Sequence, residues 1–141
     1  MKTVDVDFLD ELGRLALFAD LPKSELERIV RRSNEVSFGE GAWIIRQGDP
    51  QSDVYVIVEG EVAVVIDDED RHVLSKGAFF GEVSVLLGEP ASASIVTRTP
   101  ITCLVIPGAE VHGFLISHPQ VTYRMLKAEA RRLRTASAWP T

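Results

Sequence analysis

Cysteine is almost absent from this chain, which excludes a fold held together by disulfides within the chain. Cys103 stands alone, and a single thiol has no partner for a bridge. Apolar residues surround it, and no histidine base is indicated nearby in the sequence. We therefore interpret Cys103 as a buried strand residue and not as a catalytic nucleophile.

Long hydrophobic runs are also missing. No stretch approaches the roughly 18 to 20 apolar residues that a membrane helix needs. The N-terminal residues include Asp5, Asp7 and Asp10, where a secretory signal would be basic and then apolar. We expect a cytoplasmic protein with no membrane segment in this chain.

Positive charge is in deficit. The chain has 15 lysines and arginines against 21 aspartates and glutamates, a net charge of −6. This balance argues against a protein whose main role is to coat nucleic-acid phosphates. A local exception lies at 124–134, where five basic residues accompany one acid, Glu129. We interpret it as a solvated helix face with favourable charge near the helix C-terminus.

At 141 residues, the chain suits one domain with its own core, over residues 1–141. Its first part, residues 1–34, has helical periodicity. An amphipathic helix is predicted over 5–18. A second helix is predicted to begin near Pro22, or at a capping box formed by Ser24 and Glu27.

The pattern changes at Glu35 to short β-branched runs separated by turn residues, and this β region covers 35–107. Eight of the ten glycines lie in or directly after it, where turns need positive φ. Strands are predicted at 36–38, 43–46, 54–59, 61–66, 71–74, 92–97 and 102–106. Many short strands with regular turns predict a mainly β fold with flanking α-helices, an antiparallel jelly-roll barrel, or double-stranded β-helix.

Helical periodicity returns in the C-terminal part, residues 108–138. A short helix is predicted at 109–117 and a longer one after Pro119. In the longer helix Tyr123, Leu126, Ala130 and Leu133 form one apolar stripe. We expect most of this stripe to pack back on the barrel.

The stretch 77–96 contains the residues that indicate a ligand-binding site. Gly77 and Gly81 bracket an apolar turn, and a short helix is predicted over 83–87, directly after Glu82. Free amides at a helix start attract anions such as phosphate. A carboxylate there would accept hydrogen bonds from a sugar hydroxyl. Phosphate and ribose together indicate a nucleotide.

The order Phe80-Gly81-Glu82, then Ser84, then Gly88-Glu89-Pro90 resembles the phosphate-binding cassette of the cyclic-nucleotide-binding domain family, here at 79–95. That family includes catabolite activator proteins, regulatory subunits of cyclic-AMP-dependent kinase and cyclic-nucleotide-gated channels. The segments 46–49 and 58–62 resemble turn signatures of the same family.

The resemblance implies a ligand site made of cassette residues, with cyclic AMP or cyclic GMP as ligand and no cofactor. The implied ligand-binding residues are Phe80, Gly81, Glu82, Val83, Ser84, Ala91 and Ser92. Ala91 is a departure, because the family has at this position an arginine that holds the cyclic phosphate. Glu82 would then lie near a phosphate without a compensating cation.

Losing such a charged partner costs about 2 to 5 kcal/mol, or roughly 30-fold to several thousand-fold in affinity. Arg98 lies seven residues along the same predicted strand, about 23 Å away, too far to substitute. Arg46, Arg71 and Lys76 remain open as replacements.

We therefore expect a stand-alone sensor or regulatory domain with impaired or altered cyclic-nucleotide binding. The alternative is a degenerate domain that binds no nucleotide and serves as a protein-interaction or dimerisation module. The resemblance also implies that the last helix forms a homodimer or covers the base, and Trp139 could extend either surface.

Enzymatic activity and direct DNA binding are not expected. His72, His112 and His118 lack the spacing of a metal site of the cupin type. No histidine base is indicated beside Ser84, Ser92 or Ser94. A transcription factor of the catabolite activator type would continue into a helix-turn-helix, and these 141 residues contain none.

Overall fold

The computed structural model describes residues 4–135, so Trp139 lies outside the described residues. The N-terminal part contains α1 (Val6–Gly13), the 3-10 helix η1 (Ala16–Phe18) and α2 (Lys23–Arg31). The prediction of one helix over 5–18 is wrong at its end, because Leu15 has an extended backbone, with φ −71° and ψ 138°. The break still leaves the predicted apolar face buried. Helix α2 begins directly after Pro22, and the capping box does not form.

Within residues 4–135, eight strands form two four-stranded sheets, in which every pairing is antiparallel. One sheet has the order β1-β8-β3-β6 and the other β2-β7-β4-β5. The strands are β1 (Asn34–Phe38), β2 (Trp43–Ile45), β3 (Val54–Glu59), β4 (Val62–Ile66), β5 (Glu69–Leu74), β6 (Phe79–Phe80), β7 (Ser94–Thr97) and β8 (Ile101–Ile106). The predicted antiparallel jelly-roll fold is confirmed, and it consists of these two sheets.

Strands β5, β6 and β7 differ from the prediction, and β1 begins at Asn34, two residues earlier than predicted. Strand β5 begins at Glu69, because Asp67 and Asp68 have φ values of 53° and 63° and complete a two-residue turn between β4 and β5. Strand β7 begins only at Ser94. Strand β6 was missed, although Phe79 and Phe80 pair with Val56 and Tyr55 of β3.

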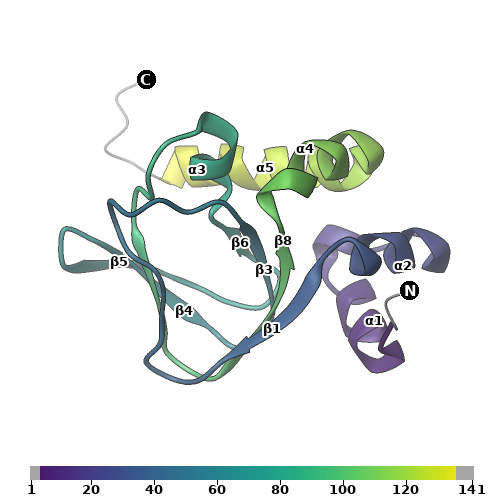
Figure 1. Cartoon of the computed structure of the whole chain (residues 1–141), viewed down its shortest axis with the longest axis horizontal. Helices are drawn as coiled ribbons and strands as arrows, with labels where there is room; N and C mark the ends of the chain where they lie inside the picture. The colour runs from purple at the N-terminus through teal and green to yellow at the C-terminus, as the bar shows by residue number, and fades with distance from the viewer. Residues whose placement is uncertain (1–3, 136–141) are drawn as a thin grey trace.

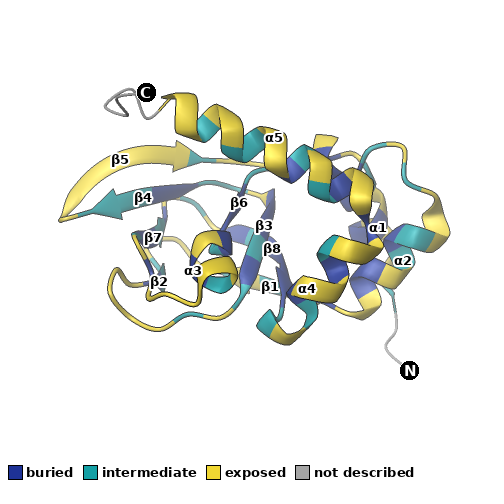
Figure 2. Cartoon of the chain, turned by 90° about the horizontal axis from the view of Figure 1, so that it is seen from above, coloured by how far each residue is buried: buried dark blue, intermediate teal, exposed yellow. Residues whose placement is uncertain are grey.

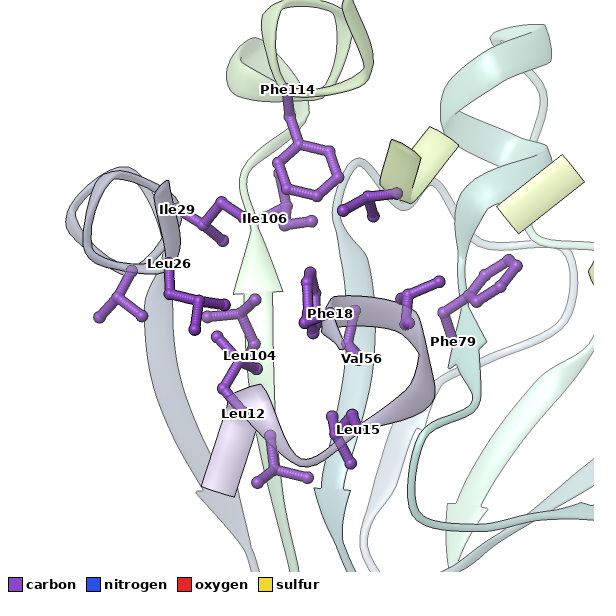
Figure 3. Packing of buried hydrophobic residues seen from close by; sticks show 14 of the residues in the cluster. Leu12, Leu15, Phe18, Leu26, Ile29, Val56, Phe79, Leu104, Ile106 and Phe114 are labelled. Carbon is purple, nitrogen blue, oxygen red and sulfur yellow. The ribbon is translucent and has the colours of Figure 1, made fainter. Parts of the chain in front are cut away.

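The core has two parts. Apolar side chains from both sheets fill the space between them, with the fully buried Cys103 among them. The second cluster joins the sheet β1-β8-β3-β6 to the helices, and Figure 3 shows Phe18, Leu104 and Ile106 in it. In Figure 1, α1, α2 and α4 (Gly108–Ser117) lie on the far side of β1 and β8 from β5.

Helix α5 (Pro119–Thr135) crosses the molecule and ends near the cassette. Val121 and Met125 are its buried residues, and Ala128 packs against the same core. The predicted packing of the apolar stripe is wrong, because Tyr123, Leu126 and Leu133 are 62%, 65% and 52% exposed and Ala130 is exposed too. The inward face is rotated from the stripe, so α5 presents much exposed surface in Figure 2.

Candidate functional site

A cavity of about 380 Å³ lies beside the cassette. Strands β2, β4 and β5, the cassette and the last turns of α5 each contribute to its wall. All seven predicted ligand-binding residues line it, namely Phe80, Gly81, Glu82, Val83, Ser84, Ala91 and Ser92. The structure therefore gathers the predicted site residues around one space.

Gly81 initiates the cassette helix α3 (Glu82–Leu87). Its φ is +87°, and an added Cβ would lie 2.5 Å from the carbonyl oxygen of Asp53. The side-chain amide of Gln51 donates to the Gly81 carbonyl at 2.6 Å and accepts from the Asp53 amide at 3.0 Å. Gln51 lines the cavity. Sequence reasoning missed it, because a lone glutamine 30 residues before the glycine gives no signal.

The other end of the cassette is held by the turn that follows β2. The Gly48 amide donates to the Ala91 carbonyl at 2.8 Å, and the Ala91 amide donates to the Asp49 carbonyl at 2.9 Å. The Gln47 amide donates to the Ser94 hydroxyl at 2.8 Å. The segments 46–49 and 79–95, both noted for their resemblance, are thus hydrogen-bonded to each other. Ala91 is fixed through both of its main-chain groups and is 6% exposed.

Glu82 is 5% exposed and has a cation beside it. Arg132 of α5 approaches the Glu82 carboxylate at 3.2 Å and the Glu129 carboxylate at 3.0 Å. The same guanidinium donates to the Phe79 carbonyl and lies 4.4 Å from the centre of the Phe79 ring. The expectation that Glu82 lacks a compensating cation is therefore wrong.

Burial raises the pKa of Glu82 from 4.5 to about 7, and the hydrogen bond and repulsion from Glu129 add to this effect. Arg132 acts in the opposite direction. Two carboxylates share one guanidinium here, so their like charges favour retention of a proton near neutral pH. Glu82, the group predicted to accept a ribose hydroxyl, therefore already interacts with Arg132 and Glu129 within the chain.

The basic residues considered as replacements for the cassette arginine are occupied elsewhere. Arg46 lies 4.7 Å from the Trp43 ring, Arg71 pairs with Glu69 at 3.6 Å, Lys76 with Glu59 at 3.7 Å and Arg98 with Asp70 at 4.0 Å. None of these four cations lines the cavity. The expectation that Arg98 cannot substitute agrees with this placement.

Basic residues of α5 do reach the cavity, which sequence reasoning missed. Arg131 and Arg132 both line it. The interpretation of 124–134 as a wholly solvated face is wrong for Arg132, and also for Arg124, which donates to the Leu17 carbonyl at 3.0 Å and the Ala19 carbonyl at 2.7 Å. The sequence did contain one signal that Arg132 faces inward. Val121, Met125, Ala128 and Arg132 step by four, three and four residues, so Arg132 continues the row that faces inward.

The other candidate groups, Cys103 and His118, are buried in the fold. Burial raises the pKa of the Cys103 thiol to about 12, so this thiol stays protonated and unreactive at neutral pH. His118 is buried and lies 2.7 Å from the Glu25 carboxylate. Within residues 4–135 no three acidic, histidine or cysteine side chains gather as a metal site would require. In the same residues no helix has the length and apolarity needed to cross a bilayer.

The structure thus shows a jelly roll with a helix-bearing loop beside a cavity of about 380 Å³. The family model described as "Cyclic nucleotide-binding domain" matches residues 35–118, and the chain belongs to this family.

Three similar proteins illustrate the relationship. The chain is 30% identical to a cGMP-dependent protein kinase of Plasmodium berghei over 84% of its own length. It is 31% identical to a cyclic nucleotide-gated potassium channel of Mesorhizobium japonicum over 90% of its length. The solved catabolite activator protein of Thermus thermophilus is 25% identical, with a TM-score of 0.73 over 86% of this chain and 60% of that one. The chain spans 14% of the kinase and 35% of the channel.

Proposed function

We propose that this chain is a regulatory domain that binds a cyclic nucleotide with impaired or altered affinity, and that it has no catalytic role. The observation that carries the proposal is Ala91, which lines the cavity at the position where the family cassette has its arginine. A kinase named for cyclic GMP and a channel named as cyclic nucleotide-gated are among its relatives, which supports a regulatory role.

The cavity offers partners for most of a nucleotide. Glu82 provides carboxylate oxygens for a ribose hydroxyl, and Ser84 and Ser92 provide hydroxyl groups. Apolar side chains such as Ile45, Val64 and Leu74 provide a surface for a base. The cassette provides no cation, so the phosphate loses the strongest contact that it has elsewhere in the family.

Isothermal titration calorimetry with cyclic AMP and cyclic GMP tests the proposal, using the unmodified chain and Ala91→Arg. We expect weak binding by the unmodified chain and a gain of about 30-fold or more in Ala91→Arg. Ala93→Arg is the matched control, because Ala93 lines the same cavity two residues further along. Ala93→Arg adds the same charge away from the arginine position and should gain far less affinity for the cyclic nucleotide.

Two results would contradict the proposal. A folded Ala91→Arg variant with no gain would mean that the loss of arginine does not limit binding. An equal gain in Ala93→Arg would mean that any added charge suffices. Micromolar binding by the unmodified chain would refute the alternative of a degenerate domain that binds no nucleotide.

We also propose that α5 mediates a homodimer. The supporting observation is the exposed stripe, in which Tyr123, Leu126 and Leu133 are each more than half exposed, since such apolar surface favours association. Sedimentation equilibrium should give a dimer that Leu126→Glu dissociates. Ile116→Glu is the control, because Ile116 is 65% exposed on α4 and lies outside the stripe. A monomer for the unmodified chain at all accessible concentrations refutes this part.

A further inference from the structure

Arg131 is the cationic side chain of the cavity wall that has no described partner. One carboxyl group, that of Glu82, and two guanidinium groups, those of Arg131 and Arg132, line the cavity. Arg132 is engaged by two carboxylates. Arg131 is exposed, and within residues 4–135 it has neither an ion pair nor a hydrogen bond. Because Arg132 is already shared by Glu82 and Glu129, Arg131 is the guanidinium of the described cavity wall that is left to meet an anionic ligand.

We propose that Arg131 binds the anionic group of the ligand and so replaces, from α5, the cation that the cassette lacks at Ala91. This inference rests on the proposed function, because it assumes that the cavity takes an anionic nucleotide. A cyclic phosphodiester carries a single negative charge, which one free guanidinium matches. The planar fork of an arginine also suits two phosphate oxygens at once.

The geometry of α5 separates the roles of the two neighbouring arginines. Adjacent residues on a helix project about 100° apart. Arg132 continues the inward row and contacts Phe79 and Glu82. Arg131 points differently yet still borders the cavity, so it can meet a ligand without breaking the contacts of Arg132.

The location of Arg131 also couples ligand binding to the position of α5. The first half of the helix is fixed by the buried Val121 and Met125. Beyond Glu129 the described residues are exposed except for the half-buried Arg132. A ligand held by Arg131 would join this exposed helix end to the cassette, an attachment that a cassette arginine alone would not make.

Calorimetry with cyclic AMP on Arg131→Gln tests the inference, with Arg134→Gln as the matched control. Arg134 is exposed on the same helix end and does not line the cavity. An exposed charge contact is modest, so we expect Arg131→Gln to weaken binding about two- to fivefold. Arg134→Gln should change it by less than about twofold. Circular dichroism confirms that each variant is folded.

Salt distinguishes a contact with an anion from a contact with the base. Raising salt from about 50 mM to about 300 mM should weaken binding more in the unmodified chain than in Arg131→Gln, since screening acts on the charge contact. In an Ala91→Arg background the restored cassette cation should make Arg131→Gln nearly neutral, because the two arginines would serve the same phosphate.

Several outcomes overturn the inference. These are equal salt dependence in both proteins, an equal loss in Arg134→Gln, or an undiminished loss in the Ala91→Arg background. If the unmodified chain binds cyclic AMP and Arg131→Gln binds it equally tightly, Arg131 does not replace the cassette cation, whereas the proposed function survives. If neither the unmodified chain nor Ala91→Arg binds, both proposals fail.

Discussion

The pH dependence of stability should show the burial of Glu82 directly. Its pKa rises from 4.5 to about 7 in the folded chain, mainly through burial. A raised pKa means that the folded state holds a proton that the unfolded chain has released. The contribution of Glu82 to stability is therefore complete below about pH 4.5 and is lost as the pH rises to about 7. Each pH unit in this window corresponds to about 1.36 kcal/mol, so the loss totals about 3 kcal/mol.

Glu82→Gln isolates this effect, because its neutral amide does not titrate. We expect the free energy of unfolding of Glu82→Gln to rise relative to the unmodified chain, by about 3 kcal/mol between about pH 4.5 and about pH 7. Urea denaturation at intervals from about pH 4 to about pH 8 measures the difference. Subtracting the two profiles removes the titration of the carboxylates that do not interact with Glu82, which both proteins share.

Glu89→Gln is the matched control, because Glu89 belongs to the same cassette but has an exposed side chain. Its profile should stay within about 0.5 kcal/mol of the unmodified chain. The reasoning fails if the difference for Glu82→Gln is flat. It fails also if the unmodified chain gains stability relative to Glu82→Gln as the pH rises, because Arg132 would then outweigh burial and Glu129.

Two further substitutions test the scaffold around the site, each by chemical denaturation. Gly81→Ala should lower the free energy of unfolding by about 2 to 4 kcal/mol, since its Cβ would meet the Asp53 carbonyl. Gly88 also has a positive φ, but an added Cβ would have no atom within 4 Å, so Gly88→Ala should lower the free energy of unfolding by only about 1 kcal/mol. Equal losses in the two variants would contradict the role of the close contact at Gly81. Arg124→Ala should lose about 2 kcal/mol, because it removes two hydrogen bonds to main-chain carbonyls. Arg134→Ala, at an exposed position, should lose almost nothing, and a similar loss there would show that helix charge alone matters.

The sequence predicted the fold well because apolar periodicity reports burial. The β-branched runs became the strands, and the glycines between them supply positive φ at turns such as Gly48 and Gly60. The prediction was wrong where a strand is very short or where contacts between distant residues determine the structure. Phe79 and Phe80 are too short a run to show alternation, and only pairing with β3 defines them as a strand.

The cassette side of the site was predictable and the helix side was not. The seven predicted residues lie within a dozen positions of one another, so local spacing brings them together. Arg132 reaches Glu82 across 50 residues, and no local pattern specifies that distance. The stripe in α5 was misread because two apolar rows compete there, and only contact with the sheet selects the row that contains Val121 and Met125.

The two arginine attachments of α5 differ in what can release them. Arg124 binds main-chain carbonyls, which neither titrate nor exchange partners with a ligand. Arg132, about 12 Å further along the helix, binds carboxylates that can take up a proton or accept a hydroxyl. Release at Arg132 would leave the start of α5 in place and free only its end to change direction. Protonation or ligand binding at the cassette would then change the direction of the end of α5 relative to the N-terminal helices, which stay in place.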